Sequence, residues 1–451
     1  MKPTRGARLG VLALVLLLLA PGCALLGVRK QRAAVEQFAR IRGTVRVEPP
    51  EDSVLVVVLV RPVPDPAPGD PSAPTIPDII DHYVLERPGA FAFAVAPGTY
   101  RLAAFADRQH NLVYDPGEPA LIGQVSFQVA AGDMRDGFEL VIPHDATLDQ
   151  TLDIRALQAR TPRDQENFSL GRFSVRGEVV DLADSKFGEA NGSMGMWRFV
   201  DFIFEVGPGV YFLEEYDPEK TPVLFVHGIS GYPQQFEELI AGLDREHFQP
   251  WFYFYPSGFR LDGIAGHLSS LVGELQTRLG FDEFAVVAHS MGGLVSRAFI
   301  QKHYEQTGRD DIPLFVAISS PWGGSEGAEN IGRAPKGIVV LSWLDMNPSS
   351  DFLRGLFLRP PDYAEARPLP EDTAFHMIFG FNRRSRSWGP SGDRVLSIRS
   401  MARPEAVQAA RSILPLDSTH VGILKSETAI ERVNDLLAEV FEGAEPKTAA
   451  R

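Results

Sequence analysis

The stretch that decides the fold comprises residues 284–298 and reads FAVVAHSMGGLVSRA. An apolar run typical of a buried strand leads directly into a serine, and apolar residues at helical spacing follow it. This succession predicts a strand, a sharp turn at Ser290 and a helix, with the serine as a candidate nucleophile. Such a turn needs small neighbours, which Ala288 and Gly292 supply two positions before and after the serine. The plainer alternative is a serine that only caps a helix.

A second stretch, residues 221–231 (TPVLFVHGISG), predicts another buried strand, which ends at His227 and Gly228. The loop after such a strand can offer a backbone amide that binds an oxyanion together with the amide following the nucleophile. We assign these two donors to Ile229 and Met291.

Strands and helices alternate from about residue 196 onward. All-apolar runs at residues 223–226 and 284–288 are typical of strands buried on both faces. Helical periodicity follows them at residues 264–279 and 293–304. The alternation predicts an α/β domain, over residues 196–445, with a mostly parallel sheet covered by helices.

The motifs VxFVHGxxG and HSMGG resemble those of lipase-like α/β-hydrolases, particularly bacterial lipases and the GPI inositol-deacylase-like branch. The resemblance covers about residues 196–440, with Ala288 where glycine is more usual. It implies a serine hydrolase in which the elbow and the neighbouring loop are supported by His227, Gly228, Ala288, His289 and Gly292. In this family the catalytic residues occur along the chain in the order serine, acid, histidine.

Three histidines follow Ser290 in the chain. His303 lies about three turns along the predicted helix and points away from the serine, and His376 begins a strand at the wrong end of the sheet. His420 lies in a loop just before the predicted terminal helix, residues 426–441, where the base of such a hydrolase belongs. We therefore predict His420 as the general base.

The acid is predicted to be Asp393, which follows the strand at residues 376–381 through a loop rich in Gly, Ser and Pro. The family's equivalent reads GDxxV, and this chain has GDRV. Asp417, three residues from His420, and Asp345 are the alternatives. A Ser-Asp-His triad needs neither a cofactor nor a metal ion.

An insertion of about 50 residues, near 325–372, separates the predicted strand at residues 314–319 from the next one. Its segment 338–357 carries large apolar groups, including Trp343 and Phe352, and Trp322 precedes it. These residues predict either a helix packed on the core or a cap that shapes an apolar acyl pocket. The cap interpretation favours acyl or lipid esters as substrates.

The region 41–146 predicts a small all-β sandwich, joined to the hydrolase by a connecting segment at residues 147–195. It resembles prealbumin-like or carboxypeptidase-regulatory-like domains, chiefly through GAFAFAVAPGTYRLAAFAD at residues 89–107. Residues 62–77 are expected to form an exposed proline-rich loop. The oxygen-rich segment 107–118 is interpreted as an ordered turn rather than a calcium site. Strands are predicted at residues 41–47, 53–61, 90–96, 99–106 and 121–129.

Cys23, the chain's one cysteine, follows a basic start, an apolar run at residues 9–20 and the small residues Ala20-Pro21-Gly22. This layout resembles a bacterial lipoprotein signal (residues 1–22), in which the cysteine is lipidated and a short helical tether follows at residues 23–40. Ala24 after the cysteine favours the outer membrane within that resemblance. An uncleaved signal anchor and a soluble secreted form are the alternatives.

The 451 residues carry 44 basic and 58 acidic side chains, a net charge of −14, which gives no footprint for nucleic acid. We expect an envelope-anchored ester hydrolase. The alternatives are a thioesterase or amidase of the same fold, a catalytically silent binding protein, and a protein whose sandwich recruits the partner.

Overall fold

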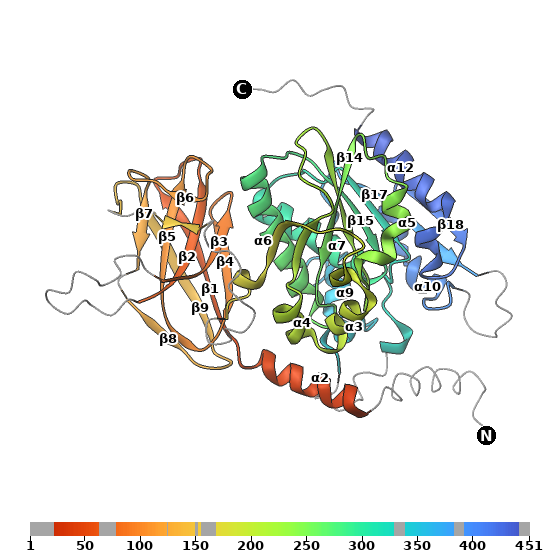
Figure 1. Ribbon diagram of the computed structural model, residues 1–451, viewed down its shortest axis with the longest axis horizontal. Helices are drawn as coiled ribbons and strands as arrows, with labels where there is room; N and C mark the ends of the chain where they lie inside the picture. Colours follow the sequence, from red (N-terminus) through yellow and green to blue (C-terminus); the bar gives the residue numbers. More distant parts are fainter. Residues whose placement is uncertain are drawn as a thin grey trace.

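The computed structural model describes residues 22–62, 78–123, 125–148, 152–154, 168–328, 339–382 and 392–441. An all-β part lies beside a larger α/β part (Figure 1). The predicted signal, most of the proline-rich loop and residues 329–338 of the insertion lie outside the described residues.

The all-β part is a sandwich of two sheets. Alternate residues of β2 point into and away from the space between the sheets: Leu55 and Val57 pack with Ile41 of β1, whereas Val56 packs with Tyr114 on the outer side. One sheet has the order β4 (Gly89–Val95), β1 (Ala39–Glu48), β9 (Met134–Pro143). The other has the order β3 (Asp78–Leu85), β2 (Val54–Arg61), β5 (Gly98–Asp107), β7 (Ala120–Ile122), and β8 (Phe127–Val129) also pairs with β5. The short strands β6 (Val113–Tyr114) and β10 (Leu152–Asp153) pair with each other.

Strands β3 and β9 were not predicted from the sequence, and β7 and β8 were predicted as one strand. Strand β3 carries charged and polar residues at its buried positions, including Asp81 and His82, so its alternation was hidden. In the segment 107–118, Asp107 accepts the amides of Asn111 and Leu112, and Glu118 accepts those of Arg108 and Asp115. The carboxylates of Asp107 and Glu118 are therefore occupied by the backbone of the turn.

The α/β part is built on an eight-stranded sheet. Its strands from β14 to β18 are all parallel, and β12 is antiparallel to β14. The order is β11 (Val175–Val179), β12 (Gly209–Phe212), β14 (Phe248–Phe254), β13 (Thr221–Val226), β15 (Ala285–His289), β16 (Leu314–Ile318), β17 (Ala374–Phe381), β18 (Ser412–Asp417). The sheet begins at β11, so the predicted boundary at residue 196 is too late and part of the predicted connecting segment belongs to the sheet.

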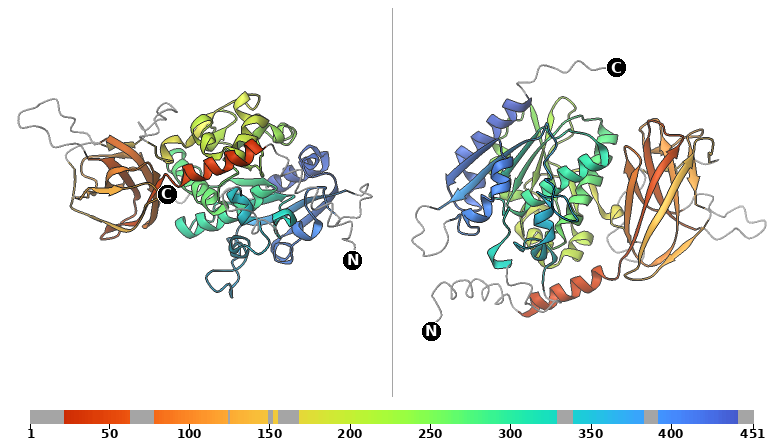
Figure 2. Two further views of the ribbon diagram at one scale, coloured as in Figure 1. Left: turned by 90° about the horizontal axis from the view of Figure 1, so that it is seen from below. Right: turned by 180° about the vertical axis from the view of Figure 1, so that it is seen from behind.

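Helices cover both faces of this sheet (Figures 1 and 2). Helices α6 (Leu261–Leu279) and α7 (Met291–Thr307) pack on one face, and α5 (Glu237–Ala241) and α12 (Glu427–Phe441) on the other. The remaining helices are α2 (Gly22–Val35), α3 (Glu189–Trp197), α4 (Phe199–Glu205), α8 (Leu341–Asp345), α9 (Asp351–Gly355), α10 (Ile398–Met401) and α11 (Pro404–Ala409), with 3-10 turns at Gly171–Phe173, Ser185–Phe187, Pro233–Phe236, Glu326–Ala328 and Gly422–Lys425.

Helix α2 occupies most of the predicted tether but packs against α4 through Gln31, so it is not a free linker. Within the described part of the chain, no helix is both long and apolar enough to cross a membrane.

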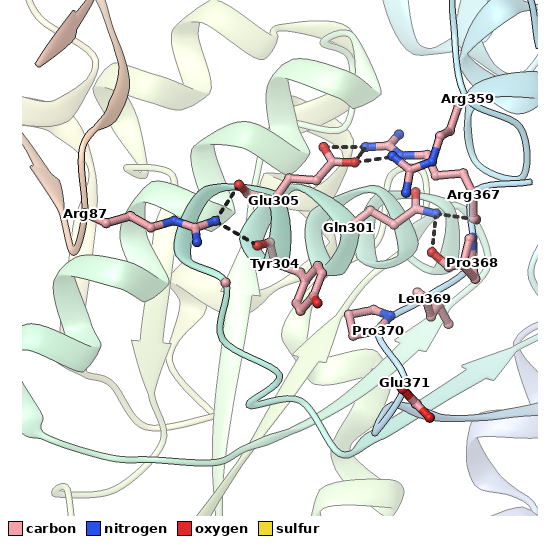
Figure 3. Close-up of a pocket in the computed structure, with 11 residues that line it drawn as sticks. Arg87, Gln301, Tyr304, Glu305, Arg359, Arg367, Pro368, Leu369, Pro370 and Glu371 are labelled. Carbon is pink, nitrogen blue, oxygen red and sulfur yellow. Dashed lines mark hydrogen bonds and ion pairs between the residues drawn. The ribbon is translucent and has the colours of Figure 1, made fainter. Parts of the chain in front are cut away.

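The sandwich contacts α6 and α7 directly. The guanidinium of Arg87, between β3 and β4, donates to the carbonyls of Glu305 and Gln306 in the last turn of α7 at 2.7 and 2.5 Å. Figure 3 shows the contact of Arg87 with the carbonyl of Glu305 beside a cavity of about 630 Å³, on whose other side Arg367 pairs with the Glu305 carboxylate. This cavity lies at the end of α7 opposite Ser290.

Candidate active site

Ser290 lies in the sharp turn between β15 and α7, with φ 56° and ψ −129°. Its amide donates to the carbonyl of Ile318 on the neighbouring strand at 2.8 Å. A Cβ at Gly228 would lie 2.7 Å from Cβ of Ser290, and a Cβ at Gly292 would lie 2.4 Å from the carbonyl oxygen of Val226. The turn therefore fits only because these two neighbours lack side chains.

His420 and Asp393 reach Ser290 from loops that follow β18 and β17. His420 Nε2 lies 2.9 Å from Ser290 Oγ, and His420 Nδ1 lies 2.6 Å from Asp393 Oδ2. The amide of His420 also donates to the carbonyl oxygen of Asp393 at 3.0 Å, which fixes the two loops to each other. The three predicted residues thus form one continuous hydrogen-bonded chain.

The Asp393 carboxylate is fully buried and is held by three groups. Its Oδ1 accepts the amides of Val395 and Leu396 at 3.0 and 2.8 Å, while Oδ2 faces His420. Burial by itself raises the pKa of Asp393, but the hydrogen bond and charge of His420, together with the two amides, outweigh burial and lower it overall. The carboxylate is therefore ionised at neutral pH.

The two predicted oxyanion donors flank Ser290. Met291 is the first residue of α7. Ile229 follows Gly228, whose Cα packs against the Ser290 side chain. Among the described residues, neither amide has a hydrogen-bond acceptor. Two free amides and a helix N-terminus at this place can stabilise a developing negative charge.

His227 and His289 are buried beneath the site. Burial lowers the pKa of His227 to about 4 and that of His289 to about 3, so both rings are neutral at pH 7. His289 Nε2 lies 2.8 Å from the carbonyl oxygen of His420, and His227 Nε2 accepts the amide of Tyr255 at 3.2 Å. The ring of His289 thus contacts the loop that carries His420, and the ring of His227 joins Tyr255, just after β14, to the loop after β13. Tyr255 was not predicted as a site residue, because nothing in its own segment shows that it would meet His227.

The alternative residues lie elsewhere. His303 pairs with Asp311 at 3.1 Å at the far end of α7, and His376 Nδ1 meets Ser412 at 2.7 Å. Asp345 accepts the amide of Leu261 at the start of α6. Asp417 ends β18 with an exposed side chain.

The candidate pocket residues divide into two groups. Trp322 is 1% exposed and packs against Phe357 and Phe375, so it belongs to the core rather than to an open pocket wall. Trp343 and Phe352 are half-buried on α8 and α9 and rest on the same core. Cys23 lies in α2, with its side chain outside the described part of the chain.

One family model and several solved structures are similar to part of this chain. The family model described as lecithin:cholesterol acyltransferase matches residues 266–346, which include Ser290. No curated protein matches the chain.

Solved structures with a similar arrangement include lipase B of Aspergillus fumigatus (16% identity, 51% of this chain and 56% of that one, TM-score 0.39) and the mature lipase BlEst2 of Bacillus licheniformis (17%, 51% and 94%, TM-score 0.37). An esterase of Pyrococcus furiosus is also similar (15%, 50% and 84%, TM-score 0.34). This chain has an α/β-hydrolase fold preceded by a β-sandwich, as the order and direction of its own strands and the serine elbow after β15 show.

Proposed function

We propose that the protein is a serine hydrolase that cleaves carboxylic esters through an acyl-enzyme. The observation that carries the proposal is the chain of hydrogen bonds from Asp393 through His420 to Ser290, at the carboxyl ends of parallel strands. His420 accepts the proton of Ser290 as its Oγ attacks the ester carbonyl, and Asp393 stabilises the imidazolium that forms.

The oxyanion is stabilised by the amides of Ile229 and Met291. His420 then returns the proton to the leaving alcohol, and water, activated by the same histidine, hydrolyses the acyl-enzyme. Every proton transfer in this cycle uses residues that already lie in place.

The test is a chain-length series of nitrophenyl esters with matched thioester and amide analogues. Ser290→Ala should lower kcat by at least about 10⁴-fold. Ser296→Ala, a buried serine on the same helix, is the matched control and should keep the activity. Circular dichroism of both variants establishes that they are folded.

Turnover that persists in Ser290→Ala, or an absence of turnover on every analogue by the folded wild type, contradicts the proposal. A preference for thioesters or amides moves the assignment within the fold. The preferred chain length distinguishes an esterase from a lipase.

We also propose that the chain is exported, lipidated at Cys23 and anchored by that lipid in the outer membrane. The support comes from the sequence of residues 1–23. Metabolic labelling with a palmitate analogue tests it, with Cys23→Ser as the variant that should lose the label.

A further inference from the structure

Helix α2 is fixed to the α/β part by buried polar contacts. Gln31, 4% exposed, accepts the amides of Val200 and Asp201 at 2.7 and 3.2 Å. These amides belong to the first turn of α4, where no carbonyl of the helix can reach them. Val28 is fully buried one turn earlier, and Arg32 donates to the carbonyl of Val339 just before α8 at 3.3 Å. The direction of α2 is therefore set by the fold.

The helices beneath α2 lie at the catalytic end of the sheet. Ser230, next to the predicted oxyanion donor, donates its hydroxyl to the sulfur of Met196 in α3 at 2.7 Å. A Cβ at Gly192 of α3 would lie 2.7 Å from the carbonyl oxygen of Ser230. Trp197, the last residue of α3, packs edge-on against Trp343 of α8. The view from below shows α2 running across this end, beside α3 and α4 (Figure 2).

The side of α2 that faces away from the protein is cationic. Arg29 and Lys30 are exposed, and neither has an acidic partner among the residues that the structure describes. The chain as a whole has a net charge of −14, so this positive side is a local feature. In the sequence it comes directly after Cys23 and the apolar run at residues 9–20.

The rim of the candidate site adds apolar side chains. Val395 and Val421, next to the triad residues Asp393 and His420, are 67% and 42% exposed. Exposed apolar side chains at the site and exposed basic side chains on α2 fit the boundary between acyl chains and anionic headgroups.

We propose that the exposed cationic side of α2 lies on a surface of anionic phospholipid headgroups and holds the catalytic end of the hydrolase toward that bilayer. Charge complementarity selects the lipid surface, and the chain arrives at α2 from the segment expected to be anchored in it. If the proposed function holds, the substrate is an ester lipid of the same membrane.

The test uses full-length protein reconstituted into phosphatidylcholine vesicles, with or without phosphatidylglycerol, that contain a dansyl-labelled lipid. The variant Arg29→Glu/Lys30→Glu reverses the charge and leaves Val28 and Gln31 intact. The control Arg46→Glu/Arg135→Glu makes the same change in charge at half-exposed positions of the sandwich. All proteins carry Ser290→Ala, and energy transfer from tryptophan to dansyl is measured at low and high salt.

The wild-type surface should show greater energy transfer with phosphatidylglycerol, and salt should remove the gain. Loss of two basic residues should lower the ratio of docked to undocked protein by roughly 30-fold, which abolishes the gain in the α2 variant alone. A gain that survives in the α2 variant, is equally lost in the control or is absent from the wild type overturns the proposal. Because catalysis is disabled here, the outcome is independent of the ester assay that tests the proposed function.

Discussion

Ser290 has a positive φ of 56°, a conformation that side chains with a Cβ rarely adopt and that costs of order 1–3 kcal/mol. The hydrogen bond from its amide to the carbonyl oxygen of Ile318 and the absence of side chains at Gly228 and Gly292 hold it there. The strain presents Oγ to His420 at the start of a helix, which is the geometry that the proposed chemistry needs.

At the same scale, Asp393→Asn should lower kcat by about 10⁴-fold with little change in KM, because an amide cannot hold His420 in the tautomer that accepts the serine proton. Asp417→Asn, the alternative acid, should leave kcat within about twofold, since exposed substitutions away from a site have small effects. Steady-state kinetics on a nitrophenyl ester measure both variants. The opposite pattern would assign the acid to Asp417.

Among the elements, the insertion between β16 and β17 is attached to the core at several points. Arg297 and Gln301 of α7 donate to the carbonyl of Leu356 at 2.8 and 3.0 Å, and Gln301 also donates to that of Arg367. Asp345, at the end of α8, accepts the amide of Leu261 at 2.7 Å. Its described helices are thus packed on the core, which agrees with the plainer of the two interpretations of residues 338–357.

The junction between α8 and α6 should show a pH dependence. Burial raises the pKa of Asp345 to about 6, above the roughly 3.9 of an unfolded aspartate. The folded state therefore favours the protonated acid, and this contribution to stability is complete below about pH 4 and lost as the pH rises through 6. Relative to wild type, Asp345→Asn should gain about 2–3 kcal/mol in unfolding free energy between pH 4 and 7.

Urea denaturation at a series of pH values measures this difference. Asp351→Asn, which removes an exposed carboxylate on α9, is the control for the loss of one acidic side chain. A difference for Asp345→Asn that stays constant between pH 4 and 7 would mean that the buried carboxylate has an ordinary pKa in the folded protein.

At the scale of the whole molecule, the sandwich packs against α6 and α7, the two helices that cover one face of the sheet. Glu274 of α6 pairs with His82 of β3 at 3.0 Å and with Arg176 at 2.5 Å, all three side chains being largely buried. Burial raises the pKa of Glu274, but the charges of Arg176 and His82 outweigh it and lower the pKa well below its usual range. Together with the hydrogen bonds that Arg87 of the sandwich donates to α7, this cluster joins the two parts of the chain.

Glu274→Gln should lower the unfolding free energy by about 3 kcal/mol, because it leaves the charge of Arg176 buried without its partner. Glu305→Gln, which removes an exposed ion pair with Arg367, should cost less than about 1 kcal/mol. Chemical denaturation of both variants compares them. Equal losses would show that the buried cluster contributes no more than a surface pair.

The sequence by itself determined the α/β class, the strand and helix on either side of Ser290, and Ser290 and His420 as the candidate nucleophile and base. These features follow from local periodicity and from the need for small residues at a tight turn, so they can be read from short segments. Short segments do not reveal the start of the sheet near residue 175, the charged strand β3 or the split between β7 and β8, because the burial of these elements comes from partners distant in the chain.

Only the tertiary structure decided which carboxylate meets His420, since Asp393 and Asp417 are both near enough in sequence and the choice depends on how two loops pack. It also placed Trp322 in the core, and it fixed the expected helical tether to α4 through Gln31. The physical reason is the same in each case: burial and hydrogen-bond partners are properties of the assembled chain, whereas periodicity and turn chemistry are properties of a segment.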